Sequence, residues 1–193
     1  APFQPFSRAP QIRYRYKTGD IQITGAALWQ SQYLSQGPEG KSQKYIKNSC
    51  VPEIYAGIDY KHKGLLIGAG IEMVSLTPRT QATVEDKIYK VSERITSLSY
   101  EVHMKYNSEK WLVAAKSVLG SNLTQTSMLG GYGIKSIDPR TGEQEYSPNR
   151  NSSSWINIVY GKTWKPAIFF GYMKNLGTSD AVTNMYGTGT NVD

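Results

Sequence analysis

The sequence predicts an all-β fold, namely an antiparallel up-and-down transmembrane β-barrel with about eight spanning strands. Apolar and polar residues alternate in segments of roughly ten residues, which is the length that a tilted strand needs to cross a bilayer. Short turns and long polar segments alternate between these runs. No sustained helical spacing of apolar residues occurs, and no stretch approaches the roughly 18 apolar residues of a membrane helix.

The clearest alternation covers residues 97–106. One parity is apolar or aromatic: Leu98, Tyr100, Val102, Met104 and Tyr106. The other parity is polar: Ser97, Ser99, Glu101, His103 and Lys105. Because a strand points successive side chains to opposite faces, this segment has one apolar and one polar face. Half-buried strands of soluble sandwiches alternate too, so the prediction depends on repetition of the pattern.

Four similar runs precede this segment. The first opposes Ile12, Tyr14 and Tyr16 to Arg13, Arg15 and Lys17. The second, after a turn at 18–20, opposes Ile21, Ile23, Gly25, Ala27 and Trp29 to Gln22, Thr24 and Gln30. The third opposes Ile54, Ala56, Ile58 and Tyr60 to Glu53, Tyr55, Gly57 and Asp59. The fourth, after a turn at 61–64, opposes Leu65, Ile67, Ala69, Ile71 and Met73 to Leu66, Gly68, Gly70 and Glu72.

Three runs follow residues 97–106. The sixth has Trp111, Val113 and Ala115 facing away from Lys116, and the seventh opposes Ile156, Ile158 and Tyr160 to Asn157. The eighth passes through Phe169, Phe170 and Tyr172, and its parity is ambiguous in the sequence. The repetition along the whole chain supports the prediction of one β-barrel domain, complete or partial, over residues 1–193.

The connections differ in length in a regular way. Tight turns fall near residues 18, 62, 108 and 163, whereas long polar segments cover 32–51, 77–93 and 119–153, with an open tail after 175. Outer-membrane barrels have short periplasmic turns and long extracellular loops, and a soluble meander has no reason to sort its loops in this way. Residues 130–137 also look like a strand. We interpret them as a hairpin arm inside the third long loop, with 138–142 as its turn.

Composition agrees with this interpretation. The chain has 39% hydrophobic residues, 14 Tyr and 18 Gly, and its mean hydropathy is negative, as expected for a barrel with a wet interior. Aromatic residues cluster beside the tight turns, either as an interfacial girdle or because aromatics favour strands: Tyr60, Tyr106, Trp111, Tyr160 and Trp164.

The net charge of +7 is spread along the chain, so we expect no nucleic-acid partner. A mild anion preference or attraction to anionic lipopolysaccharide explains the charge more simply.

The width of the barrel is a separate question. Eight strands close a narrow barrel that is filled by side chains. Glycines and charged residues on the polar parity, long loops and the loop-like segment 187–193 instead favour part of a wider barrel of about 16–18 strands.

Polar residues on the inward parity are the candidate functional residues. If the apolar parity meets lipid, the predicted lumen-lining residues are Arg13, Arg15, Glu53, Asp59, Glu72, Glu101, His103, Lys105 and Lys116. Isolated charges are too costly to bury, so these side chains must be paired or hydrated. They form either a solvated wall with balanced charge or a transverse field across a constriction, which would set ion preference.

Catalytic and metal-binding patterns are sparse, and we expect no enzyme, cofactor or metal site. His103 shares a face with Ser99 and Glu101, but residues four apart on a strand lie roughly 13 Å apart, too far for a nucleophile and its base. His62 lies in a turn between lysines, and Cys50 is the single cysteine, so neither zinc spacing nor an internal disulfide exists. The glycines at 68 and 70 lie inside a strand and do not cradle a phosphate.

Several segments resemble porin-type outer-membrane barrels of the Bacteroides group. They are SRAPQIRYRYKTGDIQITGAALWQSQYLS, PEIYAGIDYKHKGLLIGAGIEMVSLTPRT and YGKTWKPAIFFGYMKNLG, and the likeness in strand texture and loop rhythm covers roughly residues 7–177. The resemblance implies an outer-membrane location, contact with lipid and lipopolysaccharide, and passive diffusion of small hydrophilic solutes. The alternative is a structural or interaction barrel whose long loops dock a surface lipoprotein or another outer-membrane complex. Assembly as a homo-oligomer is compatible with either role.

Overall fold

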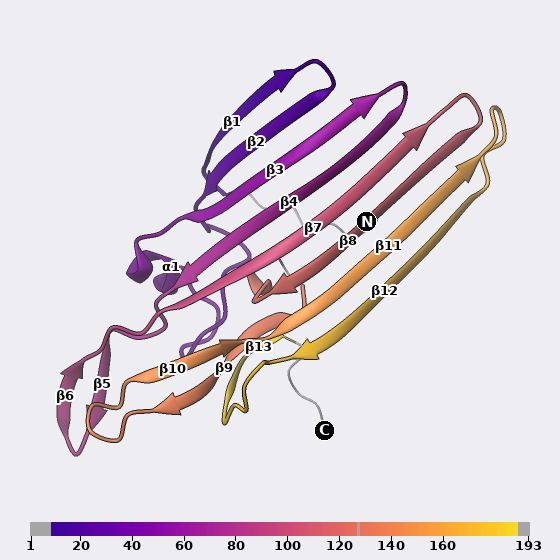
Figure 1. Ribbon diagram of the computed structural model, residues 1–193. Helices are drawn as coiled ribbons and strands as arrows, with labels where there is room; N and C mark the ends of the chain where they lie inside the picture. The colour runs from indigo at the N-terminus through magenta and orange to yellow at the C-terminus, as the bar shows by residue number, and fades with distance from the viewer. Residues whose placement is uncertain (1–8, 127, 189–193) are drawn as a thin grey trace.

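The computed structural model describes residues 9–126 and 128–188 and is dominated by one antiparallel sheet (Figure 1). Its eight strands follow one another in chain order, apart from the inserted elements between them. The strands are β1 (Gln11–Thr18), β2 (Ile21–Leu28), β3 (Glu53–His62), β4 (Leu65–Leu76), β7 (Ile95–Asn107), β8 (Trp111–Ser121), β11 (Arg150–Tyr160) and β12 (Ala167–Gly177). The predicted all-β, antiparallel fold is confirmed.

Several strands are longer than the alternating pattern indicates. β8 continues to Ser121 and β11 begins at Arg150, so the ladder extends into both ends of the predicted 119–153 loop. Polar residues dominate this extension on β11: Ser152 pairs with Leu119, Asn151 with Gly120 and Arg150 with Ser121. Sheet ladders are made by backbone groups, so a polar segment without apolar alternation still extends a strand whose neighbour is in place.

The tight turns all lie at one end of the sheet, here called the short-turn end, and the long connections lie at the other, the long-loop end (Figure 1). Gly64 shows why one of these turns needs glycine. It has a φ of 82°, and a Cβ there would collide with the backbone carbonyl of Asn107. A residue with a side chain would be both strained and obstructed at this position.

The long connections fold into small elements of their own. They are α1 (Lys44–Ser49), the hairpin β5 (Gln81–Val84) with β6 (Lys87–Lys90), the 3-10 turn η1 (Thr124–Thr126), and a sheet of β10 (Gln144–Pro148), β9 (Gly130–Ile137) and β13 (Met185–Thr188). The predicted hairpin over 130–142 is confirmed, since β9 pairs with β10 and the Asp138 N–H donates to the Glu143 carbonyl. α1, the β5–β6 hairpin and β13 are not predicted by the sequence pattern.

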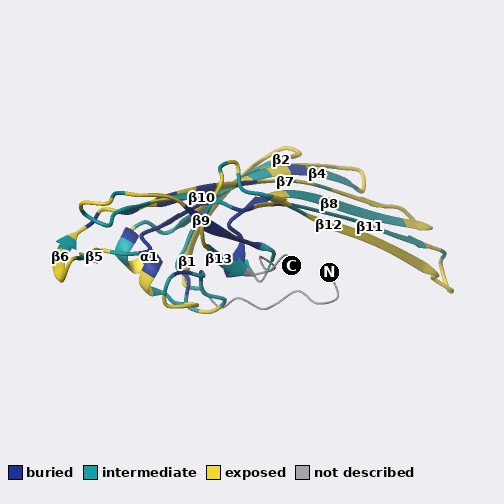
Figure 2. Cartoon of the chain, turned by 90° about the horizontal axis from the view of Figure 1, so that it is seen from below, coloured by how far each residue is buried: buried dark blue, intermediate teal, exposed yellow. Residues whose placement is uncertain are grey.

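A compact hydrophobic core lies at the long-loop end. It consists of buried residues from α1, β4, β7 and β9: Tyr45, Ile46, Val74, Leu76, Ile95 and Tyr132. Tyr132 is flanked by Tyr146 and Tyr186, with ring centroids 5.2 Å and 5.6 Å away. Figure 2 shows the buried residues gathered here, whereas the strands towards the short-turn end are intermediate or exposed. The insertions are therefore a packed unit that is anchored to the sheet.

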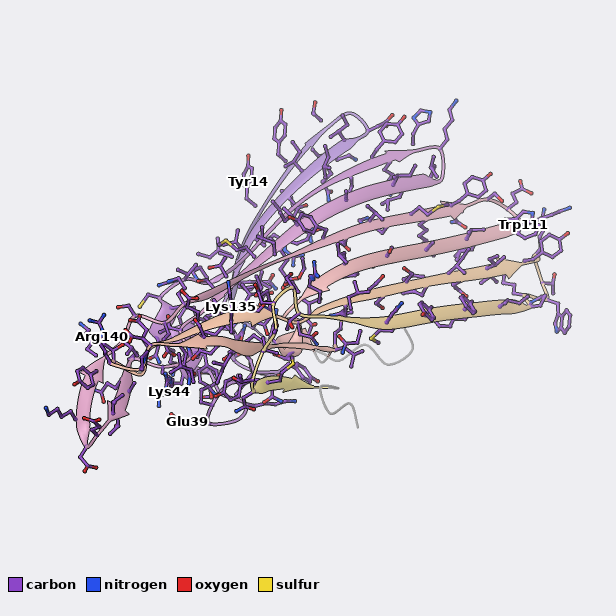
Figure 3. The ribbon with its side chains drawn as sticks, turned by 60° about the horizontal axis from the view of Figure 1, so that its bottom comes forward. Tyr14, Glu39, Lys44, Trp111, Lys135 and Arg140 are labelled. Atoms are coloured by element: carbon purple, nitrogen blue, oxygen red, sulfur yellow. The ribbon has the colours of Figure 1, made fainter. Side chains whose placement is uncertain are left out.

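The two faces of the sheet differ in chemistry. The apolar face carries exposed large side chains from all eight strands, among them Ile12, Tyr14, Ile23, Ile58, Ile67, Val102, Trp111, Ile156 and Phe170. The register resolves the ambiguous eighth strand: Ile168, Phe170 and Tyr172 share the apolar face, and Phe169 lies on the polar face opposite Asn157. Tyr14 is seen on the outermost strand in Figure 3.

The sheet is open in the part of the chain that the structure describes. β1 and β12 are its two edges. Within the described residues, no strand pairing joins one edge to the other. The closed barrel therefore remains a prediction.

Across these same ranges, no helix is both long and apolar enough to cross a membrane.

Candidate functional site

All nine predicted lumen-lining residues lie on the polar face of the sheet. Cross-strand pairing places them in neighbouring rows. One row contains Arg15, Gly57, Gly70 and Glu101, and the next contains Asp59, Gly68, His103 and Lys116. Alternation in the sequence is thus sufficient to identify the face. Whether that face lines a lumen depends on barrel closure.

The centre of this face holds a network of charged groups, which we call the wall cluster: Tyr55, Asp59, Glu101, His103 and Lys116. His103 Nε2 lies 3.0 Å from Asp59 Oδ1, and its Nδ1 lies 3.8 Å from Glu101 Oε1. The Tyr55 hydroxyl donates to Glu101 Oε1 over 2.8 Å, and the Lys116 ammonium pairs with Glu101 Oε2. Glu101 therefore has a basic partner on the neighbouring strand β8, whereas Asp59 of β3 has its basic partner two strands away, on β7. The role of Tyr55 was not predicted, since nothing in the sequence shows where its hydroxyl reaches.

Glycines make room for the wall cluster. A Cβ on Gly70 would lie 2.6 Å from the Tyr55 hydroxyl oxygen, and one on Gly68 would lie 2.5 Å from His103 Nε2. The tyrosine ring and the imidazole therefore lie across the backbone of β4, where any larger residue would displace them. Of the two roles that strand glycines suggest, curvature or space, the structure favours space.

Two further acidic residues, Glu53 and Glu72, lie nearer the long-loop end. Gln125 of η1 donates through Nε2 to Glu72 Oε1 over 3.1 Å, so an insertion reaches back onto the polar face. Gln125 is buried, and its Oε1 has no hydrogen-bond partner within the described residues. The Gln125 side chain therefore covers part of the polar face at its long-loop end.

The basic residues at the β1 edge behave differently from the wall cluster. Arg13 and Arg15 are exposed and line a shallow open hollow with Gln11, and Arg13 donates to the Gln11 side chain over 2.9 Å. No ion pair involves Arg13, Arg15 or Lys105 anywhere in residues 9–126 and 128–188. Asp59 of β3 pairs with His103 and Glu101 of β7 pairs with Lys116, and neither carboxylate pairs with the basic first strand.

A second polar network, here called the loop clasp, ties the insertions together and was missed in the sequence. The Glu93 side chain is 0% exposed and accepts hydrogen bonds from the Arg79 guanidinium, the Tyr146 hydroxyl and the Gln144 N–H. The Glu93 hydrogen bond raises the pKa of Arg79. Burial, followed by the hydrogen bond to Glu93, raises the pKa of Tyr146. At the centre of the loop clasp, the buried Glu93 carboxylate has hydrogen-bond partners for both oxygens. This arrangement indicates a structural role and not a catalytic one.

The remaining reactive side chains form no catalytic group. The Ser99 hydroxyl contacts the backbone of Ser121 and not His103, and His62 Nδ1 lies 2.7 Å from Asp20 Oδ2 at an exposed turn. Cys50 is an exposed free thiol. Within the described ranges, no three His, Cys, Asp or Glu side chains are grouped so as to hold a metal ion.

Comparisons with protein-family models, with curated proteins and with solved structures gave no significant match.

Proposed function

We propose that the chain forms the wall of an outer-membrane channel that lets small hydrophilic solutes diffuse passively. The observation that carries the proposal is the contrast between the faces of the sheet. Large apolar side chains project from one face across all eight strands, with Val102 near the middle 57% exposed. Soluble monomers rarely expose a contiguous apolar surface of this extent, whereas a barrel wall in lipid requires one.

The height of the apolar face suits a bilayer. On β7 it runs from Leu98 to Tyr106, which is eight residue steps or about 27 Å along the strand. At a tilt of roughly 40° this corresponds to about 21 Å along the membrane normal, close to the ~25 Å apolar band of outer-membrane barrels.

The aromatic residues support the same orientation. Tyr60, Tyr106, Trp111 and Tyr160 lie near the short-turn end on the apolar face, and the Trp111 and Tyr160 rings are 4.5 Å apart. In Figure 3 Trp111 lies at this end, whereas Lys44, Lys135 and Arg140 lie at the opposite one. Interfacial aromatic belts have this placement, and charged loops suit the aqueous side.

The edges of the sheet must be covered in a membrane. An unpaired strand edge in hydrocarbon leaves backbone groups without hydrogen bonds, each at a cost of several kcal/mol, so β1 and β12 need strand partners. We infer that this sheet is part of a wider barrel, in keeping with the resemblance to porin-type barrels of the Bacteroides group. Side chains of the insertions, Gln125 of η1 and Tyr132 of β9, pack against residues on the polar face of the sheet, and an eight-stranded barrel has room only for the side chains of its own strands.

The second candidate is an interaction barrel that docks a partner through its insertions. It is favoured by exposed apolar residues at the long-loop end, Ile88 and Ile137, which lie outside the main sheet. The charged polar face has no role in a pure scaffold, and this is why we prefer the channel.

Conductance in planar bilayers tests the proposal. Protein extracted from outer membranes should produce stepwise currents in KCl. Replacing both Arg13 and Arg15 by Ala should shift the reversal potential measured in a KCl gradient in the direction of greater cation selectivity. The matched control replaces Lys87 and Lys90 of the β5–β6 hairpin by Ala, which removes the same charge outside the proposed bore. Absence of any current would refute the channel. Equal reversal potentials in all three proteins would refute a role for the β1 cations in selectivity.

A further inference from the structure

Positive charge is concentrated at the short-turn end of the sheet. Seven lysines lie in the four tight turns or within three residues of them, whereas only two acidic residues do, so this end has a net charge of +5. The rest of the described chain carries 14 basic and 12 acidic residues. We call the seven lysines the lysine rim: Lys17, Lys61, Lys63, Lys105, Lys110, Lys162 and Lys165.

Most of the rim lysines have no acidic partner. All seven are exposed, and within the described residues only Lys162 forms an ion pair, with its Nζ 2.7 Å from Glu109 Oε2. In the other acidic residue at this end, Asp20, Oδ2 lies 2.7 Å from His62 Nδ1. Both local carboxylates are therefore occupied, and six ammonium groups keep their positive field towards solvent.

Three rim lysines, Lys17, Lys61 and Lys105, lie on the polar face of the sheet, on the same parity as the wall cluster. On β3, Lys61 follows Asp59 towards the tight turn, so the polar face changes from acidic to basic in this direction. Leu66 of β4 pairs in register with both Lys61 and Lys105, which places these two residues two strand spacings apart, roughly 10 Å. The rim therefore begins on the face that lines the proposed bore.

The position of the rim distinguishes between explanations of the net positive charge. Outer-membrane barrels present their long loops to the outside, so lipopolysaccharide of the outer leaflet would contact the long-loop end and not the rim. Charges that serve solubility alone need no common sign, as the nearly balanced remainder of the chain shows. A uniform sign at one end of a pore instead concentrates ions of the opposite sign there.

We propose that the lysine rim draws small anionic solutes to the short-turn mouth of the channel. Lysine rings favour anions in pores, because an ammonium group has a compact charge and three donors that suit carboxylate and phosphate oxygens. The strand lysines of the rim face away from the apolar side that would contact lipid, so solutes in the bore are their partners and lipid headgroups are not. The inference rests on the proposed channel function and names its solute class.

Chloride is the first probe, in planar bilayers of phosphatidylcholine, which contain no anionic lipid. The rim variant replaces Lys61, Lys105 and Lys165 by Gln, and the matched control replaces three exposed lysines of the long connections by Gln: Lys41, Lys87 and Lys90. In a KCl gradient centred on about 0.1 M, the rim variant should lower the permeability ratio of chloride to potassium about two- to threefold. The effect should shrink in about 1 M KCl, where the Debye length falls to about 3 Å, and the control should match the unmodified protein.

Iodide is the second probe, and it requires no channel. Trp164 is 83% exposed and directly precedes Lys165, so quenching of its fluorescence in non-ionic detergent reports the local concentration of anions. The Trp164 signal is obtained by difference from Trp164→Phe, made in each protein. The rim variant should lower the iodide quenching constant of this signal about twofold and leave quenching by neutral acrylamide unchanged, whereas the control should change neither.

The two probes separate this inference from the proposed function. Currents with equal selectivity in the rim variant and the control refute the rim and leave the channel intact. Absence of current, together with iodide quenching that falls only in the rim variant, refutes the channel and supports the rim as an anion-attracting surface. Equal iodide quenching in all three proteins refutes the rim, whether or not a current is seen.

Discussion

Placing a charge on the apolar face tests whether lipid surrounds it. Val102 is the best position, because it lies four residues from Leu98 and four from Tyr106, at the centre of the apolar run of β7. Val102 is 57% exposed, so a lysine side chain fits at this position without a clash. In a bilayer a lysine near the midplane costs about 2–4 kcal/mol, whereas on a water-exposed surface the same change stays within about 0.5 kcal/mol.

The matched control is Ile88→Lys on β6, a 71% exposed isoleucine outside the main sheet. We expect Val102→Lys to lower the free energy of unfolding by about 2–4 kcal/mol, which is a roughly 30- to 900-fold change in the folding equilibrium. Ile88→Lys should have no such effect. The measurement is urea-dependent folding into phospholipid vesicles, followed by tryptophan fluorescence and by the mobility of unheated protein on gels. Equal, small losses in both variants would refute the assignment of the apolar face to lipid.

Three further changes test the polar networks. Glu93→Gln should lower stability by about 3 kcal/mol in thermal unfolding, because it removes the buried negative charge that pairs with the partly buried Arg79 guanidinium, whereas Glu85→Gln on an exposed turn should have no effect. Gly70→Ala should cost about 1–3 kcal/mol by displacing the tyrosine ring above it, and Gly25→Ala, with open space around it, should not. Because burial raises the pKa of Tyr146 in the folded state, the phenol of the unfolded chain ionises first as pH rises, and this favours unfolding. The contribution of Tyr146 to stability is therefore complete below about pH 10 and is lost as pH rises from there through the folded-state pKa. Tyr146→Phe should therefore reduce the loss of stability between pH 9 and 12, and an unchanged pH profile would contradict this account.

The main sheet was predictable because its signal is local and repeated. Each strand contributes side chains to two faces, and the alternation from Ile12 to Tyr172 records this directly. The tight turns carry their own signal, as Gly64 shows. The eighth strand was ambiguous because Phe169 and Phe170 are adjacent aromatics. Only pairing with β11 determines which of them shares the polar face.

The insertions were less predictable because their stability comes from contacts distant in sequence. α1 has six residues, too few to show a helical period, and its Tyr45 and Ile46 are recognisable as core only once β9 lies against them. The loop clasp joins Glu93 to a tyrosine 53 residues away. Likewise, the nine charged positions of the polar face were predictable as a set, but their pairing was not. Alternation gives the face of a residue and leaves open which neighbour its charged group reaches.

The observed pairing changes what the polar face can do. An evenly charged wall would let basic β1 offset acidic β3 and β4, and the face as a whole would have little ion preference. In the structure Asp59 pairs with His103 and Glu101 with Lys116, so these two carboxylates have basic partners other than β1, and within the described residues Glu53 and Glu72 form no ion pair with β1 either. Arg13 and Arg15 then retain their full positive field towards the solvent. Because a charge acts over roughly a Debye length of 8 Å in physiological salt, these cations dominate only near the β1 edge. If the proposed channel forms, anions should therefore be concentrated along β1.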